Sequence, residues 1–259
     1  MSDVTLAARA LALLDLTDLS DNADAAGLAA LCAKAVSTPG PVAAICIWPR
    51  FVAQARSILG TGPVKIATVV NFPDGGTDTA AVVAETKAAI AAGADEIDFV
   101  LPWRNYLSAY LQEPAGTLIA HIAMLTEIRR ACGKRTLKVI LETGEYPDLD
   151  AVREASELAI LAGADFIKTS TGKTTHSASP EAARTMLEVI EKTDRAVGLK
   201  PSGGIRTLAD AAGYLVLADE IMGPGWAKPE TFRFGASGLH QVLTDVIAGG
   251  AAGQASGPY

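Results

Sequence analysis

The sequence is short of the residue types that form disulfides and metal sites. It contains three cysteines and three histidines among 259 residues. The cysteines are odd in number and none stands in a CxxC pair, which argues against a disulfide framework and a zinc site. The histidines lack the spacing of metal ligands, so no metal is expected. Reduced thiols are typical of a cytoplasmic protein, and this is the state predicted for Cys32, Cys46 and Cys132.

Long apolar runs, a signal-like start and clusters of basic charge are also missing. No apolar run reaches about 18 residues, and the opening MSDVTLAARA lacks the charged-then-apolar order of a signal peptide. The net charge is −7, from 22 basic and 29 acidic residues, and no basic run occurs. Nucleic acid and anionic membrane are therefore poor partners, and we expect a soluble protein.

The chain does contain a series of short apolar runs, each followed by small or polar residues. Eight of them are candidate strands, at residues 12–17, 42–49, 64–73, 94–102, 137–145, 164–172, 196–204 and 232–237. Segments rich in Ala, Glu and Lys with helical spacing lie between most of them. We expect the helix before the fourth strand to end at Gly93, where a left-handed residue is needed. The segments AGADEIDFV and AGADFIKTS repeat one order of helix end, turn and buried strand.

Eight strands alternating with helices predict a parallel sheet that is covered on both faces. Eight such units close into a (β/α)8 TIM barrel, with its chemistry at the carboxyl ends of the strands. A doubly wound open sheet is the alternative. We expect one barrel domain over residues 1–248, with an extra N-terminal helix, and a flexible tail over residues 249–259, which read GGAAGQASGPY.

A lysine directly follows the apolar residues of the sixth candidate strand. In ADFIKTSTGK, Lys168 comes after Phe166 and Ile167, and Lys200 ends the next strand in a similar way. A lysine that extends its amine from the strand end to solvent is the plain alternative. On strands roughly 4.8 Å apart, however, two inward-pointing lysines lie close together. Repulsion and burial then disfavour both ammonium groups, so one lysine loses its proton readily and can attack a carbonyl.

Two carboxylates occupy comparable places in other strands. Asp98 interrupts the apolar run EIDFV, where an unpaired carboxylate is costly to bury. It either forms a buried salt bridge with one of the lysines or shuttles protons beside a carbinolamine. Asp15, in LLDLT, has a similar interpretation, with capping of the next helix as its alternative.

Loops rich in small residues follow the last three strands: TSTGKT (169–174), PSGGIRT (201–207) and GASG (235–238). Glycines let backbone N–H groups converge on an anion, and barrels often bind phosphate after their last strands. The loops therefore predict a phosphorylated substrate. No GxGxxG fingerprint follows a strand, and GKT at 172–174 lacks the first glycine of a Walker loop, so no cofactor is expected.

With FIKTSTGK, VGLKPSGGIRT and EIDFVLP, the sequence resembles the deoxyribose-phosphate aldolases, which are class I aldolases on a (β/α)8 barrel. The likeness extends through LLDLTDL, AAICIWPRF, VVNFPDG, LKVILETGE, RFGASGL and a C-terminal tyrosine. It implies reversible cleavage of 2-deoxy-D-ribose 5-phosphate into acetaldehyde and D-glyceraldehyde 3-phosphate. The implied partners are thus a phosphorylated sugar and small aldehydes.

The resemblance also implies roles for individual residues. Lys168 is the implied Schiff-base lysine, Lys200 perturbs its pKa and relays protons, and Asp98 is the proton-relay acid. Tyr259 is implied to assist proton transfer at the enamine carbon. The implied substrate-binding residues are Asp15 and Thr17 at the sugar hydroxyls, Cys46 and Lys138 in the pocket wall, and Gly172, Lys173, Gly203, Gly204, Gly235 and Ser237 around the phosphate.

One position departs from the family pattern. Bacterial members often read GASS where this chain has Gly238, so the phosphate loop lacks a hydroxyl. Two other functions stay open at this point: a Schiff-base barrel aldolase acting on a keto-sugar phosphate or keto acid, and a phosphate-binding barrel in which Lys168 only pairs with Asp98. The oligomeric state is open as well, with a homodimer as one option.

Overall fold

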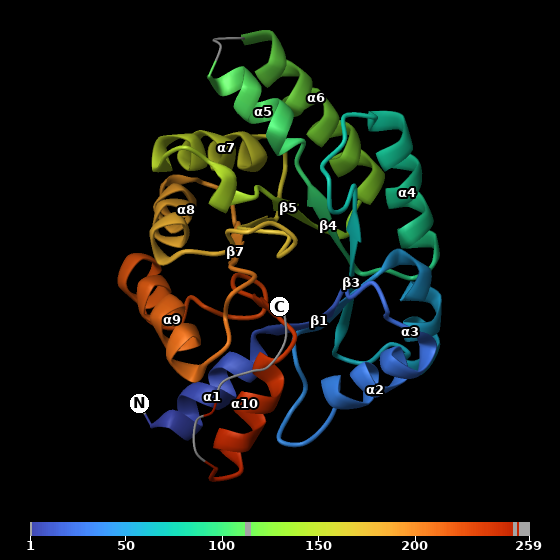
Figure 1. Cartoon of the computed structure of the whole chain (residues 1–259), viewed down its shortest axis with the longest axis vertical. Helices are drawn as coiled ribbons and strands as arrows, with labels where there is room; N and C mark the ends of the chain where they lie inside the picture. Colours follow the sequence, from blue (N-terminus) through green and yellow to red (C-terminus); the bar gives the residue numbers. More distant parts are fainter. Residues whose placement is uncertain (1, 112–114, 251–252, 254–259) are drawn as a thin grey trace.

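The computed structural model describes residues 2–111, 115–250 and 253, and its sheet has eight parallel strands. They are β1 (Leu14–Asp18), β2 (Ala44–Ile47), β3 (Lys65–Val70), β4 (Glu96–Val100), β5 (Thr136–Ile140), β6 (Phe166–Lys168), β7 (Gly198–Lys200) and β8 (Phe234–Ala236). The strands pair in chain order, and β8 pairs with β1. Bridges between Leu199 and Phe232 and between Ser202 and Gly235 join the β7 and β8 segments. The sheet therefore closes into the barrel at the centre of Figure 1, which confirms the predicted fold and excludes the open sheet.

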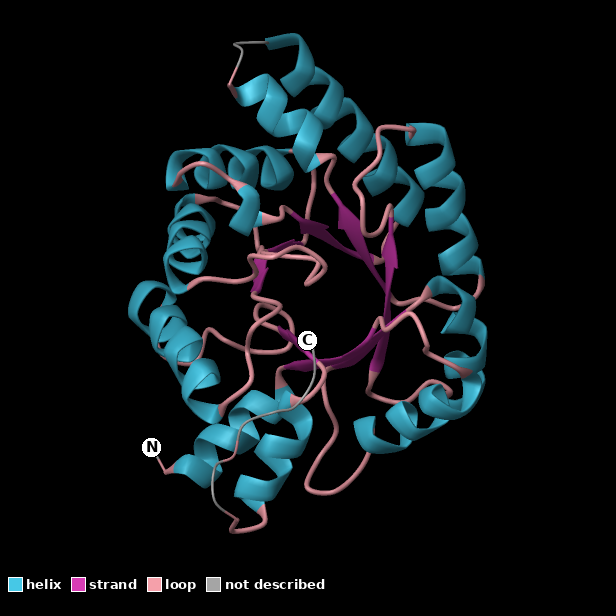
Figure 2. Cartoon of the chain, in the orientation of Figure 1, coloured by secondary structure: helices cyan, strands magenta, loops and turns pink. Residues whose placement is uncertain are grey.

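The helices form a ring around the strands (Figure 2). They are α1 (Asp3–Ala12), α2 (Ala25–Ala35), α3 (Val52–Leu59), α4 (Thr79–Ala91), α5 (Trp103–Tyr110), α6 (Ala115–Cys132), α7 (Leu149–Leu161), α8 (Pro180–Lys192), α9 (Leu208–Met222) and α10 (Leu239–Ile247), with short 3-10 helices η1 (Pro49–Phe51) and η2 (Thr143–Glu145). The predicted extra N-terminal helix is α1, which buries Ala7, Ala10 and Leu11 and packs against α10 and α9.

Local signals explain where several helices begin and end. The side chain of Asp24 accepts a hydrogen bond from the backbone N–H of Gly27 and caps α2. The capping interpretation of Asp15 is therefore wrong: this residue lies inside β1 and is fully buried. Helix α4 ends just before Gly93, whose φ of +111° is the left-handed conformation expected there.

The two repeated segments fold in the same way. Asp95 and Asp165 each accept a hydrogen bond from a backbone N–H of the preceding strand, β3 or β5, and each forms a salt bridge with an arginine of a neighbouring helix. The third residue after each aspartate therefore stands at an equivalent place in its strand. These two residues are Asp98 and Lys168.

Every strand is shorter than the apolar run that predicted it. The sixth run covers residues 164–172, but β6 pairs with its neighbours only from Phe166 to Lys168. The small polar residues after Lys168 lie outside the paired part of the strand and form a loop. The polar ends of these runs are thus loop residues.

The apolar core lies mainly outside the strands, whereas the barrel interior is mixed. Most of the core lies between the strands and the helices. Inside the barrel, one cluster consists of small apolar side chains from Leu19, Ala44, Cys46, Ala67 and Val69. Other interior positions hold buried charged groups, described below. Such a polar interior indicates a functional site, because charges are costly to bury.

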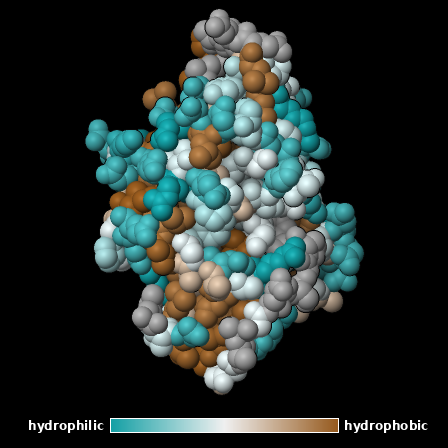
Figure 3. Space-filling model, turned by 60° about the vertical axis from the view of Figure 1, so that its left-hand side comes forward, coloured by the Kyte–Doolittle hydropathy of each residue, from teal (hydrophilic) through white to brown (hydrophobic). Residues whose placement is uncertain are grey.

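The face shown in Figure 3 has both hydrophilic and apolar areas. Figure 3 turns the side of α7, α8 and α9 forward and shows brown apolar areas among teal ones. Exposed apolar residues of these helices and α1 include Val4, Leu161 and Val216. No helix in the described part of the chain is long and apolar enough to cross a membrane.

Candidate active site

Lys168 and Lys200 lie side by side in the barrel. They end β6 and β7, and their Cα atoms are direct partners in the parallel register. Their side chains are 1% and 0% exposed. The predicted proximity is confirmed, and the alternative in which Lys168 extends to solvent is wrong. Two basic groups have thus been placed together and away from water.

Asp98 connects the lysines. Its Oδ2 atom accepts hydrogen bonds from Lys200 Nζ at 2.8 Å and from Lys168 Nζ at 3.0 Å. Its Oδ1 atom accepts one from Lys138 Nζ at 2.9 Å. The thiol of Cys46 lies 3.9 Å from Oδ2. The predicted salt bridge therefore exists, and it involves three lysines instead of one.

Asp15 belongs to the same cluster, on the far side of Lys200. Its Oδ2 atom is 2.6 Å from Lys200 Nζ and 3.6 Å from Lys138 Nζ. Thr17, two residues further along the same face of β1, donates its hydroxyl proton to the Asp15 carbonyl at 2.8 Å. Asp15 and Thr17 are both buried.

Two further members of the cluster were not selected from the sequence. Arg233, just before β8, donates from Nη1 to Asp15 at 2.6 Å and from Nη2 to Glu96 at 2.9 Å. Glu96, the first residue of β4, also accepts a hydrogen bond from Lys138 at 2.6 Å. Both are at most 6% exposed. The available signal was the same as for Lys168: Arg233 is a single charge inside the apolar run FRF.

Lys168 differs from the other basic groups of the cluster in the direction of its pKa shift. Burial and the adjacent Lys200 ammonium both lower the pKa of Lys168, and Asp98 only partly opposes them. Burial also disfavours the charged form of Lys200, but Asp15 and Asp98 outweigh it and raise the pKa of Lys200 well above its ordinary value. Of the two neighbours, Lys168 is therefore the one that becomes a free amine.

Asp98 and Asp15 both have a lowered pKa and stay ionised. Burial disfavours the charge of Asp98, but Lys138, Lys200 and Lys168 together hold its pKa well below the ordinary value. The pKa of Asp15 is likewise lowered, because Lys200, Arg233 and Lys138 overcome the effect of burial. Asp98 therefore accepts a proton readily only when a neighbouring cation is neutralised.

The loops after β6 and β7 meet above the lysines. Gly172, Gly203 and Gly204 have φ values of +74°, +81° and +80°, which side-chain-bearing residues rarely adopt. A Cβ atom on Gly203 would lie 2.6 Å from the Ser177 hydroxyl and 3.5 Å from the Cα of Gly172. Lys173, beside Gly172, is partly exposed and lies 3.5 Å from Asp21. The glycines thus bring the two loops into contact, and the partly exposed ammonium group of Lys173 lies beside them.

The β8 segment contributes the remaining predicted positions. A Cβ atom on Gly235 would lie 3.1 Å from the Lys200 side chain and 2.6 Å from that of Ser202, so this glycine makes room for Lys200. Ser237 and Gly238 follow directly, and α10 begins at Leu239 without a side-chain cap. Tyr259 lies outside the described residues.

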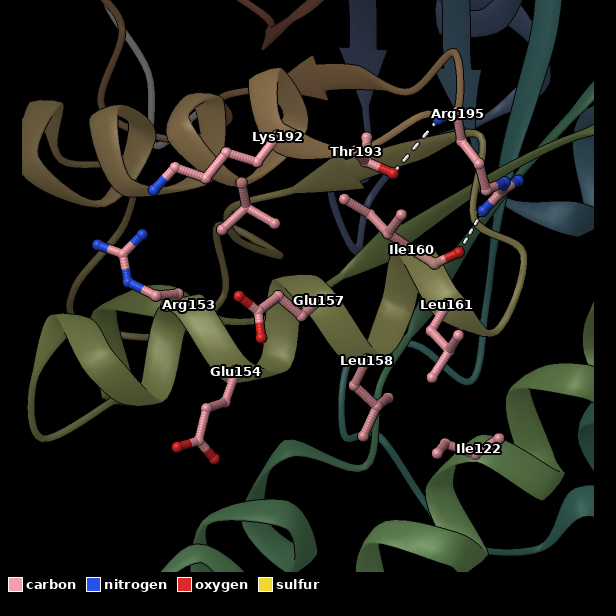
Figure 4. Close-up of a pocket in the computed structure, with 11 residues that line it drawn as sticks. Ile122, Arg153, Glu154, Glu157, Leu158, Ile160, Leu161, Lys192, Thr193 and Arg195 are labelled. Atoms are coloured by element: carbon pink, nitrogen blue, oxygen red, sulfur yellow. Dashed lines mark hydrogen bonds between the residues drawn. The ribbon is translucent and has the colours of Figure 1, made fainter.

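A separate cleft of about 910 Å³ lies outside the barrel (Figure 4). It is formed by Ile122 of α6, Arg153 and Glu157 of α7, and Lys192 of α8, among others. None of the predicted site residues lines it. In the described part of the chain, no group of three or more His, Cys, Asp or Glu side chains is placed to hold a metal ion.

A closed (β/α)8 barrel that buries a low-pKa lysine against a second lysine and a shared carboxylate defines an enzyme built for amine chemistry on carbonyl compounds. Comparison with known proteins narrows this class. The sequence model of the DeoC/LacD family aldolases matches residues 9–225, and the chain belongs to that family.

Relatives cover almost the whole chain. A deoxyribose-phosphate aldolase of Agrobacterium fabrum (strain C58 / ATCC 33970) is 52% identical over 255 residues, which are 98% of this chain and 96% of that protein. Two solved structures share the fold at 24% identity. One, from Toxoplasma gondii ME49, covers 96% of each chain with a TM-score of 0.86. The other, a tetrameric deoxyribose phosphate aldolase from Aeropyrum pernix, has a TM-score of 0.74 and covers 95% of this chain and 92% of its own.

Proposed function

We propose that this protein is a deoxyribose-phosphate aldolase, which reversibly cleaves 2-deoxy-D-ribose 5-phosphate into acetaldehyde and D-glyceraldehyde 3-phosphate through an imine on Lys168. The observation that carries the proposal is the contrast between two adjacent buried lysines, of which only Lys168 has a lowered pKa. The 52% identical relative supports the choice of sugar. Three buried free cysteines support a cytoplasmic location.

Imine formation begins with the free amine of Lys168. The amine attacks the aldehyde carbon of the open-chain sugar, and the amine proton moves to the former carbonyl oxygen to give a neutral carbinolamine. The carbinolamine hydroxyl then leaves as water and takes one proton from the Lys200 ammonium. Asp98 Oδ2 contacts both Nζ atoms, so it can pass this proton from Lys200 towards the leaving hydroxyl. Lys168 ends as an iminium and Lys200 as a neutral amine, so the total charge is unchanged.

The iminium then accepts the electrons of the bond that breaks. The neutral amine of Lys200 takes the proton of the C3 hydroxyl, a C3–O double bond forms, and the C2–C3 bonding pair moves towards the iminium to give a two-carbon enamine. D-glyceraldehyde 3-phosphate leaves from the other side of the broken bond. The Lys200 ammonium then supplies the proton for the enamine carbon, and hydrolysis of the resulting iminium releases acetaldehyde, regenerates the amine of Lys168 and returns one proton to Lys200.

Binding of the phosphate is assigned to the loops after β6, β7 and β8. Gly172, Gly203 and Gly204 open these loops to an anion, Lys173 adds a positive charge, and the uncapped start of α10 lies next to Ser237. Asp15 and Thr17 are assigned to the sugar hydroxyls, although both already have partners inside the barrel.

A substrate comparison tests the proposed function. We expect rapid cleavage of 2-deoxy-D-ribose 5-phosphate, and a kcat/KM for unphosphorylated 2-deoxyribose lower by about 100-fold, because two charge-assisted hydrogen bonds contribute about 3 kcal/mol. Gly238 lacks the hydroxyl that many family members have at this position, and this lack is expected to reduce the preference for the phosphorylated sugar. Faster condensation of glyceraldehyde 3-phosphate with a ketone than with acetaldehyde would refute the choice of donor and favour a keto-sugar aldolase.

The role of Tyr259 at the enamine carbon is proposed from the sequence alone, since this residue lies outside the described part of the chain. A phenol can exchange protons through water. Changing Tyr259 to phenylalanine is expected to slow deuterium exchange into the acetaldehyde methyl group by about 100-fold, while borohydride trapping at Lys168 persists. An unchanged exchange rate in this variant would remove Tyr259 from the mechanism.

A further inference from the structure

The buried charges of the barrel form a closed ring. Six side chains alternate in charge, and each contacts the next at 2.6 to 2.9 Å, in the order Arg233, Asp15, Lys200, Asp98, Lys138, Glu96 and back to Arg233. All six are nearly or completely buried. Three positive and three negative charges make this ring neutral by itself.

Lys168 is the seventh ionisable group and lies outside the ring. It contacts Asp98 Oδ2, an oxygen atom that Lys200 already occupies at a shorter distance. No other carboxylate within the described residues forms a salt bridge with it. A proton on Lys168 would therefore give the buried cluster one surplus positive charge, which burial penalises strongly.

Arg233 and Glu96 close the ring on the side away from Lys168. Arg233 is fixed there: its guanidinium donates to Pro229, Asp15 and Glu96 and lies over the ring of Phe166 at 5.7 Å. Phe166 in turn packs where Gly198 has no Cβ atom. An arginine keeps its charge at all physiological pH values, so it supplies a permanent third cation to the ring.

We propose that Arg233 and Glu96 are positioning residues that complete a neutral ring of six charges and thereby leave Lys168 as the one base of the cluster that gives up its proton before substrate binds. The inference rests on the proposed function of Lys168 as the imine-forming lysine. Neither residue needs to touch the substrate, since both act through the charge of the ring.

The ionisable groups near Lys168 come from several elements, and they are Lys200 of β7, Asp98 of β4, Cys46 of β2, Lys138 of β5, Asp15 of β1 and Glu142 after β5. Burial raises the pKa of the Cys46 thiol, which therefore stays neutral. Glu142 accepts hydrogen bonds from Thr171 and Thr174 instead of joining the ring. Glu142 and Cys46 are the same in all variants of Arg233. Differences in the pH dependence of trapping between these variants therefore come from the change in the charge of the ring.

The test is the pH dependence of borohydride trapping with acetaldehyde in variants whose fold is checked by circular dichroism. Arg233→Gln leaves the ring with a surplus negative charge, which favours the Lys168 ammonium. We expect the midpoint of trapping to move to higher pH and the trapping rate at pH 7 to fall by about tenfold. Arg233→Lys keeps the charge and should keep the midpoint near that of the unmodified protein.

The double variant Arg233→Gln/Glu96→Gln makes the ring neutral again and should restore the midpoint, which a merely structural role of Arg233 would not do. If Arg233→Gln does not fold, Glu96→Gln provides the test with the opposite sign, a midpoint at lower pH. Normal trapping in the unmodified protein together with unshifted midpoints in the variants would refute the proposed role of Arg233 and Glu96 and leave the proposed function intact. Failure of the unmodified protein to trap acetaldehyde at Lys168 would instead overturn the proposed function.

Discussion

Changing Lys168 to methionine is expected to abolish aldol cleavage, with a loss in kcat of at least about 10⁴-fold, since the nucleophile carries the whole covalent pathway. Methionine has a similar length and no basic nitrogen, and the six-membered ring of charges remains complete without Lys168. The matched control is Lys65→Met, which removes an exposed lysine at the opposite end of a strand, β3. Retention of more than about a tenth of the activity in Lys168→Met would contradict the assignment.

The same variant should not lose stability. Because the pKa of Lys168 is lowered in the folded protein, folding favours the neutral form of this lysine. The unfolded chain binds more protons between the folded pKa and the ordinary lysine value, so stability of the unmodified protein rises with pH across that window. Methionine removes this dependence, and the Tm of the variant is expected to equal or exceed that of the unmodified protein near pH 7.

Changing Lys200 to leucine is expected to slow turnover by about 10²- to 10⁴-fold, because the proton donor for water release is lost. It should also move imine formation to higher pH. Leucine removes the like charge beside Lys168 and leaves Asp98 Oδ2 to Lys168 alone, so the pKa of Lys168 rises. Stability should fall by about 3 kcal/mol, because Asp15 and Asp98 each lose a buried partner.

The measurement for Lys200→Leu is the rate of trapping over a range of pH, with Lys192→Leu on the surface of α8 as the control. The pKa of Lys200 is raised in the folded protein, so its contribution to stability is present at neutral pH and is lost only as the pH rises through that raised value. An unchanged pH profile of trapping in Lys200→Leu would show that the two amines do not interact.

Much of the site was visible in the sequence because its key groups interrupt apolar strands. Lys168, Lys200 and Asp98 each break an apolar run, and the period of two along a strand places them on its inner face. The repeated segment even sets Asp98 and Lys168 at equivalent places. The strand order then brings Lys168 and Lys200 together, because consecutive units of a barrel are neighbours.

The partners across the barrel were less accessible to sequence reasoning. Arg233 and Glu96 lie 137 residues apart, and they meet only because the closed sheet brings β8 opposite β4. The alternation of side chains along a strand identifies which residues face inward. It does not identify the residue of another strand that each of them contacts across the barrel. Asp15 shows the same difficulty: from the sequence, a role like that of Asp98 and a helix cap both stayed open, whereas three cations surround it in the fold.

The central claim is that Lys168, and no other lysine, forms the imine. Its most direct test is mass spectrometry of the full-length protein after borohydride reduction in the presence of acetaldehyde. The account predicts one reduced two-carbon unit per chain, located on Lys168, with Lys138 and Lys200 unmodified because both stay protonated within the ring. A two-carbon unit on Lys200 or Lys138, with Lys168 left free, would contradict it.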